Sequence, residues 1–198
     1  MFDVAGAVLV GGRSARMGRD KALIEIGGIP MAQRVATVLQ DAGCNPVFAV
    51  GPARLAAGLD GVSDEYPGEG PLGGIITALR AAAPSPVLVL ACDLPWIDAA
   101  TVDAVLAAAR AGHRGDDRGD DRGDDRGDDR AQVFMACAAR REPLCAVWTP
   151  GAVTTLQRVF DMGERAVHRA AAQLVVDEVA VHAGGLINVN APDDLTSE

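Results

Sequence analysis

The sequence predicts an α/β protein in which helices cover both faces of a mostly parallel, Rossmann-like sheet, giving three layers. Apolar runs of strand length alternate with segments of helical periodicity along most of the chain. One run, residues 86–91, is apolar throughout, which is typical of a strand buried on both faces of a parallel sheet. With 198 residues, 49% of them hydrophobic, the chain is long enough to bury the core of a single domain.

The N-terminal half is expected to alternate strictly between strand and helix. The expected elements are a strand at 4–10, a helix at 30–42, a strand at 46–50, a helix at 72–82, a strand at 86–91 and a helix at 98–111. The first strand ends in two adjacent glycines, and the fourth element is entered through a proline. For the last helix, Asp98 is the expected N-cap and Gly112 the expected stop.

The C-terminal half continues the alternation after an unusual insertion. The expected elements are strands at 133–138 and 144–148, helices at 152–160 and 164–172, strands at 174–181 and 186–189, and a short helix at 192–195. In open parallel sheets, ligands bind beyond the carboxyl ends of the strands. A site is therefore expected where the strands 4–10, 86–91 and 186–189 end.

The insertion, residues 114–130, reads R-G-D-D-R-G-D-D-R-G-D-D-R-G-D-D-R. It contains no apolar residue, so nothing in it can be buried to offset the entropy of ordering it. We expect a disordered acidic loop within one nucleotide-binding domain that spans residues 1–198. An acidic tether or a trap for cations is the alternative interpretation of its eight aspartates and four repeat arginines.

Composition excludes several classes of function. The 18 basic and 27 acidic residues give a formal net charge of -9, which argues against a nucleic-acid-binding protein. No stretch approaches the roughly 18 apolar residues that span a membrane. The four cysteines, Cys44, Cys92, Cys137 and Cys145, form no C-x-x-C pair, so we expect reduced thiols in a cytoplasmic protein.

The turn after the first strand carries the strongest signal for a phosphate ligand. Gly11 and Gly12 let backbone N–H groups approach a ligand closely, and Arg16 and Lys21 add positive charge within the same segment. This combination is suited to a polyphosphate. It is neither a Rossmann G-x-G-x-x-G, because Arg13 interrupts that pattern, nor a Walker A motif, which needs Lys-Ser/Thr after its last glycine.

Three further positions point to the same edge of the sheet. Asp93 follows the apolar strand 86–91 and is a candidate Mg²⁺ ligand, since Asp98 already serves as the expected helix cap. Asn188 and Asn190 share one face of the last expected strand, where amide oxygens can complete a metal shell or hold a phosphate. Asp64 begins a Pro- and Gly-rich loop that is a candidate wall for a base.

These motifs together resemble the molybdenum cofactor guanylyltransferases. The segments that carry the resemblance are, in order, L-V-G-G-R-S-A-R-M-G-R-D-K, D-E-Y-P-G-E-G-P-L-G-G, L-A-C-D-L-P, P-L-C-A-V-W and N-V-N-A-P-D-D-L. The resemblance implies a GT-A-like nucleotidyltransferase fold, with Mg²⁺ as cofactor. It also implies transfer of GMP from GTP to the phosphate of molybdopterin, with release of pyrophosphate.

The resemblance assigns roles residue by residue. Arg16, Lys21 and Asp93 are the implied catalytic residues, with Asp93 also binding Mg²⁺. The implied GTP-binding residues are Leu9, Val10, Gly11, Gly12, Lys21, Asp64, Gly73, Asp93, Asn188 and Asn190. The segment Gly163-Glu164-Arg165 resembles a loop that approaches the pterin. GTP and molybdopterin are the implied partners, together with transient contacts to cofactor-biosynthesis proteins or recipient molybdoenzymes, and with neither nucleic acid nor membrane.

The sequence departs from the family pattern at three places. Val10 replaces the commoner alanine, residues 50–52 lack the usual asparagine, and the turn at 139–142 is unusually rich in arginine. Other functions therefore stay open: a cytidylyltransferase for the same cofactor, a sugar-phosphate nucleotidyltransferase, a catalytically silent nucleotide-binding module, or an NAD-dependent dehydrogenase. The presence of both Lys21 and Asp93 argues against the silent module, and the interrupted G-x-G-x-x-G argues against the dehydrogenase.

The expected reaction makes few demands on acid–base residues. The attacking phosphate is already an anion, so no general base is needed, and catalysis rests on positioning and charge neutralisation. The three histidines, His113, His168 and His182, lie outside every motif, in agreement with such a reaction.

Overall fold

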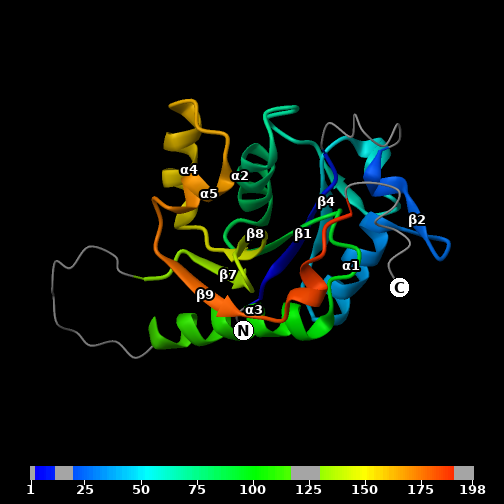
Figure 1. Ribbon diagram of the computed structural model, residues 1–198. Helices are drawn as coiled ribbons and strands as arrows, with labels where there is room; N and C mark the ends of the chain where they lie inside the picture. Colours follow the sequence, from blue (N-terminus) through cyan, green and yellow to red (C-terminus); the bar gives the residue numbers. More distant parts are fainter. Residues whose placement is uncertain (1–2, 12–19, 117–129, 190–198) are drawn as a thin grey trace, which may run out of the picture.

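A central sheet of seven strands organises the chain, and helices pack on both of its faces (Figure 1). The computed structural model describes residues 3–11, 20–116 and 130–189. Its elements are β1 (Ala5–Leu9), η1 (Lys21–Leu23), β2 (Glu25–Ile26), β3 (Ile29–Pro30), α1 (Met31–Asp41), β4 (Val47–Val50), η2 (Ala53–Leu55), β5 (Asp60–Val62), α2 (Pro71–Ala82), β6 (Val87–Ala91), α3 (Ala99–Asp116), β7 (Val133–Cys137), β8 (Arg141–Trp148), α4 (Ala152–Asp161), α5 (Val167–Ala171), β9 (Val176–Ala180) and η3 (Ala183–Leu186).

The strand order is β5-β4-β1-β6-β8-β7-β9. Strands β5, β4, β1 and β6 pair in parallel, β8 runs antiparallel to both of its neighbours, and β9 is again parallel to β7. The expectation of a mostly parallel α/β sheet is therefore confirmed. The sequence did not reveal β5, or the small β2–β3 hairpin, because both are very short.

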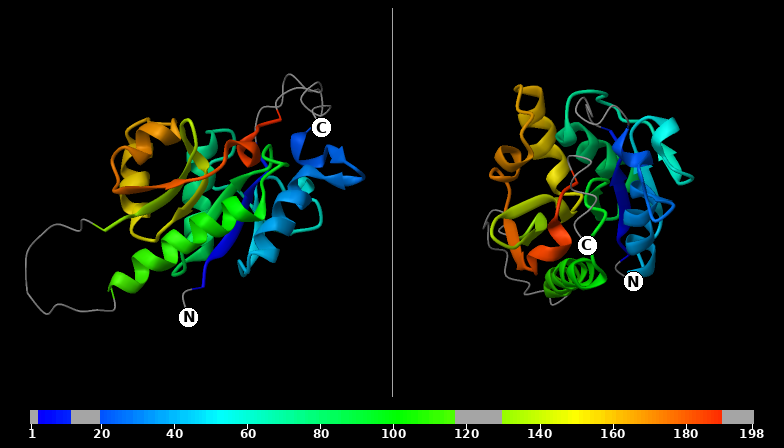
Figure 2. Two further views of the ribbon diagram at one scale, coloured as in Figure 1. Left: turned by 60° about the horizontal axis from the view of Figure 1, so that its bottom comes forward. Right: turned by 45° about the vertical axis from the view of Figure 1, so that its right-hand side comes forward.

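Two apolar layers fill the space between sheet and helices. On one face, α1 and α3 pack on side chains such as Val8 and Leu90. On the other face, α2, α4 and α5 pack on the alternate side chains of the same strands, such as Ala7 and Val89. The views agree that α3 and α4 lie on opposite sides of the sheet (Figures 1 and 2). The predicted three-layer architecture is confirmed.

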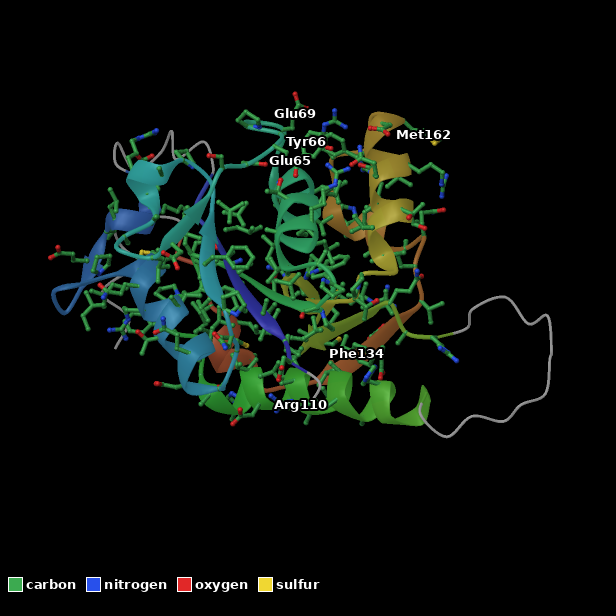
Figure 3. The ribbon with its side chains drawn as sticks, turned by 180° about the vertical axis from the view of Figure 1, so that it is seen from behind. Glu65, Tyr66, Glu69, Arg110, Phe134 and Met162 are labelled. Atoms are coloured by element: carbon green, nitrogen blue, oxygen red, sulfur yellow. The ribbon has the colours of Figure 1, made fainter. Side chains whose placement is uncertain are left out.

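Helix α3 corrects one expectation about its end. Asp98 caps it as expected, since the backbone N–H of Thr101 donates to Asp98 Oδ1 at 2.7 Å. Gly112, however, does not stop the helix, which continues to Asp116. The glycine serves packing instead, because a Cβ at that position would lie 2.5 Å from Cζ of Phe134, a residue of β7 that faces α3 (Figure 3).

The repeat segment and the C-terminal segment bring two further corrections. Residues 114–116 belong to α3, so the expected disordered insertion does not begin at 114; residues 117–129 lie outside the described part of the chain. The expected strand 186–189 does not form, because Leu186 ends the 3-10 helix η3 and residues 187–189, the last that the structure describes, pair with no strand. The expected helix 192–195 lies outside the described residues. No helix in the described ranges is long and apolar enough to span a membrane.

Candidate functional site

The site is built on the carboxyl ends of β1 and β6, the two adjacent strands at the centre of the sheet. The backbone N–H of Cys92 donates to the carbonyl oxygen of Leu9 at 3.2 Å, which holds the two strand ends side by side. The backbone N–H of Val10 donates to Val50 at 3.0 Å and so ties β1 to β4 on its other side. The segments that follow β1 and β6 consequently emerge together at one edge of the sheet, as expected for an α/β fold.

Lys21 and Asp93 meet at this edge. The Lys21 Nζ lies 3.3 Å from Asp93 Oδ2, and the two side chains are 18% and 26% exposed. Lys21 comes from η1 and Asp93 from the turn after β6, so an acid and a base far apart in the sequence are brought into contact. The structure thus brings two of the sequence-predicted site residues together, and their roles in catalysis stay a prediction.

A cavity of about 190 Å³ opens beside the pair. Its lining combines the end of β1, the turn after β6 and the start of η1, and consists of Leu9, Val10, Gly11, Asp20, Lys21, Ala22, Leu55, Pro71, Ala91, Cys92, Asp93 and Leu144. We call it cavity A. Five of the residues implied by the resemblance, Leu9, Val10, Gly11, Lys21 and Asp93, thus line one cavity.

A second, larger cavity of about 670 Å³ adjoins the first. Its lining is Gly11, Gly51, Pro52, Ser63, Asp64, Pro67, Gly68, Gly70 and Pro71, and we call it cavity B. Gly11 and Pro71 line both cavities. Cavities A and B therefore form adjacent compartments along the edge of the sheet, one charged and one bounded mainly by glycine and proline backbone.

Asp64 is oriented by its neighbours at the wall of cavity B. Its Oδ1 accepts hydrogen bonds from the backbone N–H of Tyr66 at 2.9 Å and from the hydroxyl of Thr77 at 3.2 Å. The buried Thr77 hydroxyl also accepts from the backbone N–H of Glu65 at 3.1 Å. These bonds fix the carboxyl group against the first turns of α2, so that it faces the cavity in a defined orientation.

Gly73 allows Tyr66 to pack closely against α2. It lies buried in the first turns of α2, and a Cβ there would be 2.7 Å from Cβ of Tyr66. The glycine lets Tyr66 pack directly onto the helix and does not line cavity A or B. The structure thus accounts for this residue through the Tyr66 contact, and its role in nucleotide binding stays a prediction.

The segment around Asn188 reaches the same edge without forming a strand. The backbone N–H of Val189 donates to the carbonyl oxygen of Asp93 at 2.9 Å. Asn188 is half-buried and does not line cavity A or B. Gly12, Arg16 and Asn190 lie outside the described residues.

The thiols near the site are held neutral. Burial raises the pKa of Cys92 to about 12, with the Asp93 charge acting in the same direction, and burial raises the pKa of Cys145 to about 12 as well. All four cysteines are free. A thiol with such a pKa is protonated at neutral pH and is a poor nucleophile, so the site relies on charge and hydrogen bonding.

Asp93 is suited to hold a divalent cation together with a ligand. Its carboxylate is a hard oxygen donor, it is partly exposed, and it lines cavity A. Within the described residues, no three His, Cys, Asp or Glu side chains gather into a metal cluster. Mg²⁺ is commonly bound by one or two carboxylates, water and substrate phosphates, so the single carboxylate fits a magnesium ion that arrives with a polyphosphate.

The sequence interpretation missed several contributors. Asp20, Leu55 and Leu144 also line cavity A, and the last two are apolar side chains that give no chemical signal of their own. Leu144 belongs to the P-L-C-A-V-W segment, which contributes to the family resemblance but to which the sequence assigns no ligand contact. Glu142, two residues earlier, has its pKa raised, first by burial and also by the neighbouring Asp93 charge.

Comparisons with known proteins identify the family of the chain. A family model described as "MobA-like NTP transferase domain" matches residues 6–179. A "Probable molybdenum cofactor guanylyltransferase" of Opitutus terrae is 38% identical over 178 residues, which cover 87% of this chain and 79% of the relative. A protein of the same name from Chloroflexus aggregans is 32% identical over 97% of this chain and 91% of its own.

Solved structures show the same fold. The "Molybdopterin-guanine dinucleotide biosynthesis protein A" of Archaeoglobus fulgidus matches with a TM-score of 0.73 and 22% identity, covering 97% of this chain and 95% of its own. The 2-C-methyl-D-erythritol 4-phosphate cytidylyltransferase of Thermus thermophilus matches with a TM-score of 0.66 and 17% identity, over 98% and 95% of the two chains. The fold is therefore one that several nucleotidyltransferases share.

Proposed function

The chain belongs to the family of MobA-like NTP transferase domains, and from this premise we propose that it transfers GMP from GTP to the phosphate of molybdopterin. The products are the guanine dinucleotide form of the cofactor and pyrophosphate. The observation that carries the proposal is the Lys21–Asp93 pair at the ends of β1 and β6, in a cavity that adjoins the larger cavity B. The names of the relatives support guanine and molybdopterin as the two substrates.

The two cavities suggest how GTP is held. Cavity A takes the triphosphate, because Lys21 supplies positive charge and Gly11 exposes backbone next to it. Cavity B takes the guanosine, with Asp64 at its wall and the 63–70 backbone around it. Gly11 and Pro71, which line both cavities, then lie near the α-phosphate, where the reaction takes place.

The residues of the chain act mainly by neutralising and aligning charge. An oxygen of the acceptor phosphate attacks the α-phosphorus, a new O–P bond forms, and the bond to the bridging oxygen of the leaving pyrophosphate breaks. Lys21 stabilises the charge that grows on the pyrophosphate, as does Arg16 in the proposed mechanism. The acceptor phosphate is already anionic, so no side chain has to remove a proton from it.

Nucleotidyl transfer typically uses a divalent metal ion, and we propose Mg²⁺ held by Asp93. When bound, the ion neutralises the phosphate oxygens and orients the α-phosphate for in-line attack. Asn188 and Asn190 are proposed to bind GTP at the same reaction centre, since the backbone N–H of Val189 donates to the carbonyl oxygen of Asp93. Transient delivery of the product to recipient enzymes belongs to the same proposal, as does a location in the cytoplasm.

Product analysis tests the proposal. The protein is incubated with molybdopterin, Mg²⁺ and GTP, CTP, UTP or ATP in separate reactions, and the pterin products are identified by mass spectrometry. We expect a guanine dinucleotide product from GTP at a rate well above that with the other nucleotides. A preference for CTP would assign the chain to cytidylyl transfer, and the absence of a nucleotidylated pterin with all four nucleotides would contradict molybdopterin as the acceptor.

A further inference from the structure

The outer wall of cavity B is a glycine-containing loop whose shape depends in part on contacts with other elements. Residues 64–70, which we call the B loop, contribute Asp64, Pro67, Gly68 and Gly70 to the lining. Gly68 and Gly70 have φ angles of 84° and 91°. Glycine permits the turn at such φ angles, but it also gives the loop backbone access to many other conformations. Contacts from outside the B loop therefore add to its internal hydrogen bonds in selecting the conformation that shapes the cavity.

The first anchor of the B loop is Tyr66. Its hydroxyl donates to Gln157 Oε1 of α4 at 2.9 Å, and its ring centroid lies 4.6 Å from that of Phe160, also on α4. Arg80 of α2 donates to the Tyr66 hydroxyl at 3.0 Å and pairs with Glu65. The labelled Glu65 and Tyr66 lie at the top of α2, on the side that faces α4 (Figure 3).

The second anchor is Arg165, in the loop between α4 and α5. Its Nε donates to Glu69 Oε2 at 2.7 Å, while its Nη1 donates to the carbonyl oxygens of Phe160 at 2.7 Å and Glu164 at 2.9 Å. The guanidinium carbon also lies 3.9 Å from the centroid of the Phe160 ring. The guanidinium is thus held by contacts with Phe160 and Glu164, and its Nε–H binds the B loop at Glu69, the residue between Gly68 and Gly70.

We propose that Arg165 is a positioning residue for the nucleotide: through Glu69 it holds the B loop in the conformation that binds the guanosine in cavity B. The inference rests on the proposed function, because it takes cavity B as the place of the base and ribose. The family resemblance implies that the segment Gly163-Glu164-Arg165 approaches the pterin. In the structure, the Arg165 side chain joins Glu69 of the B loop to Phe160 of α4.

The energetic contribution of the pair to folding is expected to be small. Arg165 and Glu69 are 39% and 51% exposed, and ion pairs of that exposure contribute little to global stability. The pair instead selects among conformations of a glycine-rich loop, and a ligand that contacts this loop depends on that selection. Loss of the pair is therefore expected to weaken nucleotide binding more than it lowers thermal stability.

Arg169 is a suitable control in the same region. It lies on α5, is 64% exposed and pairs with Glu164 at 2.6 Å, and it makes no hydrogen bond or ion pair with the B loop among the described residues. Arg165→Ala and Arg169→Ala therefore remove the same charge from neighbouring positions. Only the first removes an anchor of cavity B.

The test measures binding of GTP to the wild type and to Arg165→Ala, Glu69→Ala, the double variant and Arg169→Ala, together with kcat, KM and Tm. We expect Arg165→Ala and Glu69→Ala each to raise Kd and KM for GTP by about 3- to 30-fold, with kcat nearly unchanged. The Kd of the double variant for GTP is expected to be no higher than the higher of the two single-variant values, because both substitutions remove the same interaction. Arg165→Lys is expected to bind GTP more tightly than Arg165→Ala but less tightly than the wild type, since lysine keeps the positive charge but lacks the planar guanidinium with its several N–H donors.

Two outcomes would overturn the inference, and they are distinguishable from failure of the proposed function. If Arg165→Ala and Arg169→Ala bind GTP as the wild type does, the anchor has no role in positioning. If Arg165→Ala lowers Tm and Glu69→Ala, which changes only an exposed loop side chain, leaves Kd unchanged, Arg165 acts through folding alone. A wild-type protein that binds no nucleoside triphosphate would instead refute the proposed function on which the inference rests.

Discussion

The Lys21 ammonium and the Asp93 carboxylate lie 3.3 Å apart, although 72 residues separate them in the chain. The contact joins the segment after β1 to the turn after β6. Each residue neutralises the other in the partly buried cavity A, and each has a separate proposed role toward the triphosphate. This pair is therefore the first target for substitution.

Asp93→Ala is expected to reduce GMP transfer by more than about 100-fold, because the proposed metal ligand is lost. Its stability is expected to change by less than about 1 kcal/mol, since Asp93 is partly exposed and in a single ion pair. Transfer rates and urea unfolding measure the two effects. Near-normal turnover with Mg²⁺ would show that another residue holds the metal.

Asp98→Ala is the matched control, because it removes the same group five residues later. Its Oδ1 caps α3 through the Thr101 N–H at 2.7 Å. The substitution is expected to cost about 0.5–2 kcal/mol of stability and to leave transfer intact. If the Asp98 variant lost activity as the Asp93 variant does, the whole turn rather than the Asp93 carboxylate would be essential.

Lys21→Met is expected to lower kcat/KM for GTP by about 100-fold, because a cation beside the triphosphate is lost in a partly buried site. Arg54→Ala is the control: Arg54 is 69% exposed and pairs with Asp20, next to Lys21, at 3.7 Å. Steady-state kinetics at fixed Mg²⁺ compares the two. Equal effects of both variants would mean that the general positive potential, and not the position of Lys21, matters.

Gly112→Ala is expected to destabilise the protein by about 1–2 kcal/mol, because the new Cβ meets the Phe134 ring in a packed interface. Alanine favours a helix over glycine by about 1 kcal/mol, so propensity alone predicts the opposite sign. Urea unfolding decides between them. Adding Phe134→Leu should relieve the clash, so that the two changes are non-additive; a stabilised Gly112→Ala variant would contradict the packing argument.

Glu164 gives a pH-dependent prediction. Hydrogen bonds from Arg169 and from the backbone N–H groups of Ala166 and Arg165 lower its pKa from 4.5 to about 2. A carboxyl group with a lowered pKa in the folded state contributes stability that is complete above pH 4.5 and is lost as the pH falls toward 2. The difference in unfolding free energy between wild type and Glu164→Gln should therefore shrink over this range. A constant difference from pH 7 to pH 3 would show that the Glu164 charge contributes nothing.

The sequence predicted those parts of the fold that depend on local pattern. The apolar strand β6, the proline at the start of α2 and the Asp98 cap of α3 each depend on only a few neighbouring residues, and Asp93 follows β6 as expected. The sequence-based predictions were wrong where tertiary packing decides whether a helix ends or a strand forms. Gly112 is typical of a helix stop but instead allows contact with Phe134, and residues 187–189 alternate like a strand but form no ladder with another strand in the described part of the chain.

The contacts that shape cavity B could not be predicted, because they join distant segments. Arg165 and Glu69 are 96 residues apart, and Tyr66 meets Gln157 across 91 residues. A single sequence contains no signal that pairs these residues. Only the packing of α4 against α2 brings them together.

The most direct test of the account follows the fate of the two ends of the triphosphate. The protein is incubated with molybdopterin, Mg²⁺ and GTP labelled with ³²P at either the α- or the γ-phosphorus. We predict that the α label appears in the pterin dinucleotide and the γ label in pyrophosphate, in equal molar amounts. Transfer of the γ label to the pterin, or its release as inorganic phosphate with no α label on the pterin, would contradict guanylyl transfer at this site.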